Sequence, residues 1–211
     1  MTLPLNTIIC GDCLDVMKTF EDKSVDLVLT DPPYGINLEY LSYDDTQENW
    51  ERLFLAFMPE FKRISKMAIF PVCRIDRLKW IYENHPPDWI ICWYKGSPGH
   101  RSFVGFNDWE PLLVYGKNDG IQMHDHFYAP PGGESSIHPC PKSLPWALWL
   151  LERASKPGSI VLDPFLGSGT TAVACKKLGR NFIGIEKEPA YVEIAKKRLE
   201  KVNNHKIEEW F

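Results

Sequence analysis

The chain has 211 residues, of which 44% are hydrophobic and 25% are charged. These proportions are ordinary for a globular protein, so they exclude extended disorder, and the length indicates a single domain over residues 1–211. No apolar run approaches the ~18 residues that a membrane-spanning helix needs, and the first residues lack the pattern of a signal peptide. We therefore expect a cytoplasmic protein without a membrane partner.

The net charge of −4 conceals a segregation of acidic and basic side chains. Residues 1–60 carry 12 acidic and 3 basic side chains, whereas residues 61–102 carry 3 acidic and 8 basic ones. The overall acidic balance argues mildly against nucleic-acid binding, because contacts to phosphate need Lys and Arg. The basic segment can supply such contacts, although ordinary variation over the surface explains the same pattern equally well.

Short apolar runs alternate with helical patterns along the chain, which is typical of a doubly wound α/β sheet. Several runs are nearly continuous in Val, Ile and Leu, as in central strands that are covered on both faces. We expect seven strands, at residues 7–10, 25–30, 67–72, 89–94, 111–115, 159–162 and 181–185. We expect helices at residues 14–20, 50–64, 74–84, 143–155, 170–178 and 189–203, with Pro59 producing a kink or dividing the second into two.

Three stretches fit neither pattern, at residues 32–46, 96–108 and 117–141. Each is longer than the usual connection within a compact domain, and each contains Pro, Gly, His or aromatic residues rather than a polar linker sequence. Segments of this kind are commonly lids or binding loops. We interpret all three as binding loops.

The six cysteines are scattered, and only Cys10 and Cys13 form a CxxC pair. A zinc ribbon needs a second such pair, and His138 with Cys140 is the only nearby substitute. Pro139 and Pro141 hold that substitute in an extended form. We therefore expect reduced thiols and no metal site.

Residues 31–35 read Asp-Pro-Pro-Tyr-Gly and directly follow the strand expected at residues 25–30. The two prolines fix φ and remove two N–H donors, so the corner is rigid and the Asp31 and Pro32 carbonyls do not continue a helix. A carboxylate, outward carbonyls and the ring of Tyr34 suit a planar base with an exocyclic amine. The alternative interpretation is that these residues form only a turn.

Residues 163–171 read Asp-Pro-Phe-Leu-Gly-Ser-Gly-Thr-Thr and lie between an expected strand and an expected helix. Gly167 and Gly169 let the backbone approach a ligand, and the following helix offers unpaired N–H groups. Ala172 occupies the place of the third glycine in a dinucleotide fingerprint, which excludes that motif. No Gly-Lys-Ser/Thr follows, which excludes a P-loop.

Glu186 ends the next expected strand, where a carboxylate can accept hydrogen bonds from ribose hydroxyls. Together with the glycine loop, Glu186 indicates a cofactor that contains a ribose and does not require a phosphate. The alternative is a tight strand–helix turn with an incidental glutamate.

The two motifs together resemble those of the S-adenosylmethionine-dependent DNA amino-methyltransferases, which modify adenine N6 or cytosine N4. Because the DPPYG corner precedes the glycine loop, the order is similar to that of the circularly permuted beta class. Residues 6–36 and 138–199 carry the resemblance well, and residues 88–117 carry it more loosely. The resemblance implies a Rossmann-like class I methyltransferase fold with a doubly wound, mostly parallel, seven-stranded sheet.

The resemblance also assigns roles to individual residues. Asp31 and the Pro32 carbonyl would polarise the amine of a base flipped out of double-stranded DNA, while Tyr34 would stack on that base and Pro33 would line its pocket. S-adenosylmethionine would meet Asp12 beside its adenine and Lys142 beside its carboxylate. The remaining cofactor-binding residues would be Asp163, Phe165, Gly167, Gly169, Thr170 and Glu186.

In this family an Asp at the first position of the corner accompanies adenine, whereas a Ser accompanies cytosine. Asp31 therefore favours transfer to adenine N6 in DNA, in a bacterial or phage enzyme of the restriction–modification kind. The alternatives are cytosine N4 in DNA, an amine in RNA, and a non-catalytic subunit that binds the cofactor.

DNA contacts are expected from Lys95 and Arg101, which lie within the basic segment 61–102. Residues 96–109 and 117–141 are candidate DNA-contact or recognition loops within the catalytic domain. Larger family members carry a long target-recognition segment at this point of the chain. Here the corresponding segment consists only of residues 118–137, which is too short for a large recognition domain. Selectivity is then relaxed, short or supplied by a second subunit, and the resemblance makes a homodimer plausible.

Overall fold

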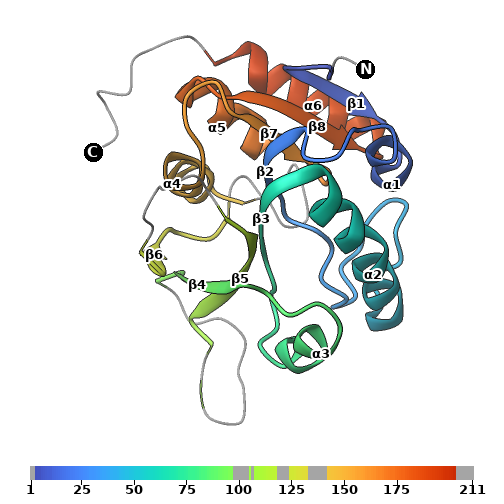
Figure 1. Cartoon of the computed structure of the whole chain (residues 1–211), viewed down its shortest axis with the longest axis vertical. Helices are drawn as coiled ribbons and strands as arrows, with labels where there is room; N and C mark the ends of the chain where they lie inside the picture. The colour runs from blue at the N-terminus through green and yellow to red at the C-terminus, as the bar shows by residue number, and fades with distance from the viewer. Residues whose placement is uncertain (1–2, 97–104, 106, 118–123, 133–141, 203–211) are drawn as a thin grey trace.

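The computed structural model describes residues 3–96, 105, 107–117, 124–132 and 142–202. Within them, one eight-stranded sheet has the order β1-β8-β7-β2-β3-β5-β4-β6 (Figure 1). Strands β1, β8, β7, β2 and β3 are parallel to one another, β5 runs against β3 and β4, and β6 pairs in parallel with β4. The strands are β1 Thr7–Cys10, β2 Val25–Leu29, β3 Ser65–Pro71, β4 Trp89–Tyr94, β5 Trp109–Gly116, β6 His126–Tyr128, β7 Ile160–Asp163 and β8 Asn181–Glu186.

The predicted α/β class is confirmed, but the expected number of strands is wrong. All seven expected strands are present, and β6 is an eighth that lies within the stretch 117–141 interpreted as a loop. β6 has only three residues, with Phe127 as its single buried side chain, so it carries no period that a sequence pattern could reveal. The Phe127 ring stacks on Trp149 of α4 at 4.2 Å between centroids, and this distant contact holds the strand at the sheet edge.

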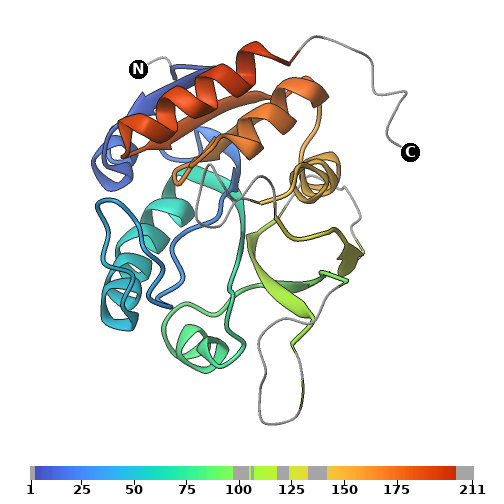
Figure 2. The same cartoon turned by 180° about the vertical axis from the view of Figure 1, so that it is seen from behind.

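Helices cover both faces of the sheet. They are α1 Cys13–Met17, α2 Gln47–Ile64, α3 Arg77–Asn84, α4 Leu144–Ala154, α5 Thr170–Leu178 and α6 Pro189–Glu200. Side chains of α1, α2 and α3 form one apolar cluster with alternate residues of the strands, whereas those of α4, α5 and α6 form a second. Figure 2 shows α5 and α6 side by side on the same face of the molecule.

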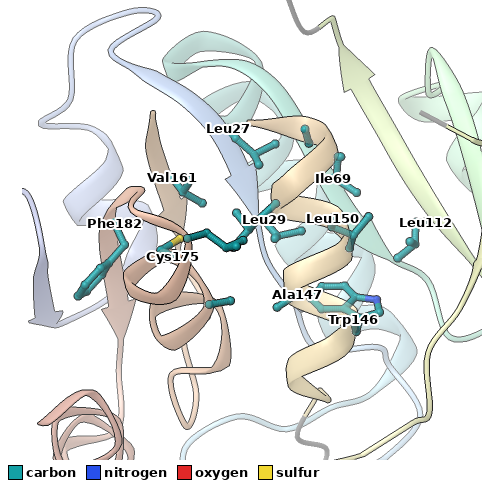
Figure 3. Packing of buried hydrophobic residues seen from close by; sticks show 14 of the residues in the cluster. Leu27, Leu29, Ile69, Leu112, Trp146, Ala147, Leu150, Val161, Cys175 and Phe182 are labelled. Atoms are coloured by element: carbon teal, nitrogen blue, oxygen red, sulfur yellow. The ribbon is translucent and has the colours of Figure 1, made fainter. Parts of the chain in front are cut away.

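The second cluster places α4 directly against the centre of the sheet (Figure 3). Trp146 and Leu150 of α4 lie among Leu29, Ile69 and Leu112, which come from three different strands, and Trp146 is only 1% exposed. α4 therefore brings its first turn to the carboxyl ends of the central strands.

Helix α2 is continuous from Gln47 to Ile64 with Pro59 inside it, so of the two expected effects of the proline, a kink or a division into two helices, the division does not occur. Phe57 and Phe61, on either side of the proline, are fully buried and contact Phe70 of β3 at 5.7 and 5.9 Å between ring centroids. These contacts fix both halves of the helix on the same strand, which offsets the lost backbone hydrogen bond.

Candidate active site

A cleft opens at the carboxyl ends of the parallel strands, where ligands bind in open α/β sheets. Its walls come from the segments after β1, β2, β7 and β8, from residues 40–43, and from the start of α4. Most residues that the sequence singles out line this one cleft: Asp12, Asp31, Pro33, Lys142, Asp163, Phe165, Gly167, Thr170 and Glu186. Sequence segments more than 150 residues apart thus meet because their strands are parallel neighbours.

The DPPYG corner follows β2 and is held by a lysine from a distant part of the chain. Lys142 Nζ donates to Asp31 Oδ2 at 2.7 Å and to the Tyr34 hydroxyl at 2.5 Å. The Tyr34 hydroxyl in turn donates to Asp31 Oδ1. The Lys142 side chain is 7% exposed and that of Asp31 is 20% exposed. Both carboxylate oxygens of Asp31 therefore have a protein donor, while each keeps a second lone pair for a ligand.

This placement adds to what the sequence implies for Lys142 and Tyr34. The Lys142 ammonium forms an ion pair with Asp31, whereas the resemblance implies that it contacts the cofactor carboxylate. The Tyr34 side chain is buried, at 5% exposed, with the Lys142 Nζ 4.9 Å from its ring centroid. Pro32 is buried behind the corner, whereas Pro33 faces the cleft.

Asp163 joins the glycine loop to the strand that carries the corner. Its Oδ1 accepts from the Thr30 hydroxyl at 2.6 Å and from the Phe165 N–H at 3.2 Å. Burial raises the pKa of Asp163 to about 7, although the hydrogen bond from Thr30 opposes this shift. Sequence reasoning missed Thr30, whose only signal is a polar residue at the end of an apolar strand.

The structure requires glycine at the two positions of the loop, Gly167 and Gly169, for different reasons. Gly167 has φ +52, and its N–H donates to Glu186 Oε2 at 2.7 Å. Gly169 has φ +86 at the start of α5, where an added Cβ would lie 2.8 Å from the Cβ of Ala195 in α6. Gly169 therefore permits close packing of two helices, while Gly167 brings the loop backbone to the end of β8.

Glu186 and Asp12 face the cleft from adjacent strands, because Cys10 of β1 pairs with Glu186 of β8. Glu186 Oε1 also accepts from the Glu188 N–H at 2.9 Å, and burial raises the pKa of Glu186. Asp12 Oδ1 caps α1 by accepting from the Leu14 N–H at 2.9 Å. These backbone donors orient two carboxylates toward the cleft and leave lone pairs for hydroxyl or amine donors.

The chemistry of the cleft fits a ribose-containing ligand without phosphates. Its basic residues, Lys142 and Lys187, both lie beside carboxylates, at 2.7 Å from Asp31 and 3.8 Å from Asp12. At the start of α4, within the described part of the chain, the buried Trp146 Nε1 has no hydrogen-bond partner, so a donor for a ligand is present. Among the described residues of the cleft, Glu186 and Asp12 can accept hydrogen bonds from ribose hydroxyls and an amine, and both lysines lie beside carboxylates rather than where they would bind a phosphate. This donor and acceptor set matches S-adenosylmethionine.

The remaining predicted contacts lie away from the cleft or cannot be placed. Lys95 donates to Glu110 Oε1 at 2.8 Å, and the two side chains are 13% and 9% exposed. Lys95 thus forms a buried ion pair with Glu110, whereas the sequence predicts a lysine that faces DNA. Arg101, His138, Cys140 and much of residues 96–109 and 117–141 lie outside the described residues.

Over the described ranges, no cluster of three or more His, Cys, Asp or Glu side chains is placed to bind a metal ion. Nor does any helix among these residues have the length and apolar character needed to cross a membrane.

The fold and the two motifs together define an amino-methyltransferase of nucleic acids, and comparison with known proteins identifies the family. Residues 106–197 match the family described as DNA methylase. The chain is 30% identical to the Type II methyltransferase M.HinfI of Haemophilus influenzae, over 94% of this chain and 69% of that protein. It is 30% identical to the Type II methyltransferase M.HpaI of Haemophilus parainfluenzae, over 92% and 74%. The chain therefore belongs to the DNA methylases that modify adenine N6 or cytosine N4.

Solved structures agree with this assignment. The complex of M1.HpyAVI with S-adenosylmethionine is similar with a TM-score of 0.63 and 28% identity, covering 92% of this chain and 98% of that one. The cytosine-N4-specific PvuII DNA methyltransferase has a TM-score of 0.70 at 16% identity, covering 94% and 86%. The second likeness concerns the fold alone. The class I methyltransferase fold expected from the sequence is thereby confirmed.

Proposed function

We propose that this DNA methyltransferase transfers the methyl group of S-adenosylmethionine to N6 of an adenine flipped out of double-stranded DNA. The observation that carries the proposal is the Asp31 carboxylate, which lies in the cleft with both oxygens oriented by Lys142 and Tyr34. Family resemblance associates Asp at this position with adenine. The fold likeness to a cytosine-N4 enzyme has no bearing on the base, because it extends only to architecture.

Each part of the cleft then has a task. S-adenosylmethionine supplies a sulfonium methyl group that a weak amine nucleophile can accept. Glu186 accepts hydrogen bonds from the ribose hydroxyls, Asp12 lies toward the adenine of the cofactor, and Gly167 gives its backbone room. Phe165 and Thr170 complete the wall, and the Thr170 hydroxyl donates to the Lys142 carbonyl at 3.2 Å, which ties the cofactor loop to the base-binding corner.

The target amine is a poor nucleophile because its lone pair is delocalised into the base ring. Asp31 and the Pro32 carbonyl would accept hydrogen bonds from its two N–H groups, which favours a tetrahedral nitrogen with its lone pair directed toward the methyl group. As the N–C bond forms, the S–C bond of the sulfonium would break, S-adenosylhomocysteine would leave, and the nitrogen would lose one proton to solvent. Tyr34, which is buried beside the cleft, would stack on the base after the base enters, and its ring orientation is fixed because its hydroxyl contacts both Asp31 and Lys142. Such orientation is worth ~7–11 kcal/mol in favourable intramolecular reactions.

The target base must leave the duplex, since the amine of a paired base cannot meet the methyl group in line. Base flipping is part of this proposal, and fluorescence of 2-aminopurine at the target position measures it.

A homodimer that completes the DNA surface is also part of the proposal, and sedimentation of the chain with and without DNA measures it.

A transfer assay with labelled S-adenosylmethionine tests the proposed function. Unmethylated duplex DNA, single-stranded DNA and RNA are offered separately, and the product is digested to nucleosides. N6-methyl-2′-deoxyadenosine from DNA supports the proposal, whereas N4-methyl-2′-deoxycytidine or a labelled RNA contradicts it. Binding of the cofactor without transfer to any nucleic acid points to a non-catalytic subunit. Asp31→Ala is the control for contaminating activity.

A further inference from the structure

The loop between the DPPYG corner and α2 is closed by one buried carboxylate. Asp45 is 1% exposed, and it accepts three backbone hydrogen bonds. Its Oδ1 accepts from the Gly35 N–H at 2.7 Å, and its Oδ2 accepts from the Ile36 N–H at 3.1 Å and the Leu38 N–H at 3.2 Å. A side chain ten residues ahead in sequence thus fixes the backbone that leaves the catalytic corner.

Arg77 holds the same turn from the opposite side. Its Nη2 donates to the Gly35 carbonyl at 3.1 Å, and the residue is 6% exposed. The guanidinium also lies 5.1 Å from the ring centroid of Trp50 in α2. Both polar groups of the Gly35 backbone are therefore bound by buried charged side chains, one from the loop and one from α3.

Gly35 has little freedom to adopt another position. Its φ is +68, and an added Cβ would lie 2.7 Å from the Cβ of Trp50. Gly35 is bonded directly to Tyr34, whose hydroxyl must reach Asp31 and Lys142. A shift of the Gly35 backbone therefore displaces Tyr34 and disturbs the donors that orient Asp31.

We propose that Asp45, with Arg77, is a positioning residue for methyl transfer, which acts by fixing the Gly35 backbone and through it Tyr34 and Asp31. Asp45 is absent from the residues that line the cleft, so it acts through other residues rather than by touching a ligand. The inference rests on the proposed function and adds to it a buried clamp behind the base pocket.

A clamp of this kind has a kinetic signature that a general contribution to stability lacks. Positional errors of about 1 Å at a reacting centre cost ~10²-fold in rate. Loosening the turn should therefore lower kcat far more than it changes the KM for DNA or the Kd of S-adenosylmethionine. Loss of folded protein would lower the apparent enzyme concentration and leave the kcat of the folded fraction unchanged.

The test is Asp45→Asn in the full chain, with Asp44→Asn as the matched control on an exposed neighbouring residue. The amide keeps one acceptor and turns a donor toward a backbone N–H, so the turn loosens with little change in volume. We expect kcat per folded molecule to fall by about 10²-fold, with KM for DNA and cofactor Kd within about threefold and the control unchanged. A kcat within twofold of wild type, or a loss confined to cofactor Kd, overturns the inference.

Hydrogen exchange gives a second readout on the same proteins. The amides of Gly35, Ile36 and Leu38 should exchange at least about tenfold faster in Asp45→Asn than in Asp44→Asn, because their carboxylate acceptor is weakened. If Asp45→Asn does not fold, Arg77→Lys replaces it, since Lys keeps the charge and lacks the planar donor fork. For Arg77→Lys we expect a tenfold lower kcat, and an unchanged kcat overturns the inference.

The two proposals fail in distinguishable ways. A wild-type chain that methylates no nucleic acid overturns the proposed function and the clamp's catalytic role together. An active wild type with a fully active Asp45→Asn overturns the clamp alone.

Discussion

Two lysine–carboxylate pairs, one in the cleft and one where β4 ends and β5 begins, have nearly the same geometry. Lys142 lies 2.7 Å from Asp31, and Lys95 lies 2.8 Å from Glu110. All four side chains are largely buried. In the first pair, Lys142 also donates to the Tyr34 hydroxyl, and both Asp31 and Lys142 line the cleft. Neither Lys95 nor Glu110 lines it. A buried lysine–carboxylate ion pair can therefore take part in catalysis only where a ligand can reach the lysine or the carboxylate.

The largest effect is expected from removing the carboxylate of the cleft pair. Asp31→Ala deletes the acceptor for the target amine and leaves Glu186, Asp12 and the glycine loop intact. We expect methyl transfer to fall by ~10³-fold, the upper end of the loss seen when one preorganised group at a reacting centre is removed. Titration calorimetry should give a cofactor Kd within a few fold of wild type. A variant that methylates at nearly the wild-type rate contradicts the proposed mechanism.

Removing the cation of the same pair is expected to have the next largest effect. Lys142→Met keeps the volume of the side chain, but Asp31 loses its Oδ2 donor and the Tyr34 hydroxyl loses a partner. We expect kcat to fall by about 10²-fold because Asp31 is no longer oriented.

Lys142→Arg is the matched variant, and it should restore part of the rate by keeping a charged donor near Asp31. If the loss instead appears wholly in the cofactor Kd, Lys142 serves the cofactor carboxylate, as the family resemblance implies, and the orienting role is wrong.

A third buried carboxylate, that of Asp163, is held by Thr30 and by the backbone rather than by a lysine. Burial raises its pKa from 3.8 to about 7 in the folded chain. The folded state therefore binds this proton more tightly than the unfolded state. The resulting stability is fully present below pH ~4 and is lost as the pH rises through 7, by about 4 kcal/mol at most.

Asp163→Asn isolates this effect, since the amide can accept from Thr30 and does not ionise. The difference in Tm between wild type and Asp163→Asn should move against wild type between pH 4.5 and 7.5. A difference that stays constant over this range means that Asp163 does not titrate there.

The features that were predictable from the sequence are those that short segments determine. Continuous apolar runs identify the central strands, and the prolines and glycines of the two motifs restrict φ locally. The parallel order then brings Asp31, Asp163 and Glu186 to one edge of the sheet.

Partners across the fold were not predictable. Lys142 and Asp31 are 111 residues apart, and Thr30 and Asp163 are 133 apart, with no pattern that links them. Lys95 is one example. Its position near the end of a basic segment predicts a DNA contact, and nothing in the sequence predicts its ion pair with Glu110. Asp45 is a similar case, since an acidic loop residue ordinarily faces solvent.

The smallest effect on catalysis, and the clearest contrast with Lys142, is expected from Lys95→Met. Breaking a buried pair from one side leaves Glu110 with an uncompensated charge, which costs about 3 kcal/mol and lowers Tm by roughly 6–12 °C for a chain of this size. Because neither Lys95 nor Glu110 lines the cleft, kcat and the KM for DNA should stay within about twofold of wild type, and the dependence of DNA affinity on salt should keep its slope. Thermal melts and DNA binding at several salt concentrations measure both. A flatter salt slope with an unchanged Tm would restore Lys95 as a contact to phosphate, and the ion pair with Glu110 would then be a resting arrangement that DNA displaces.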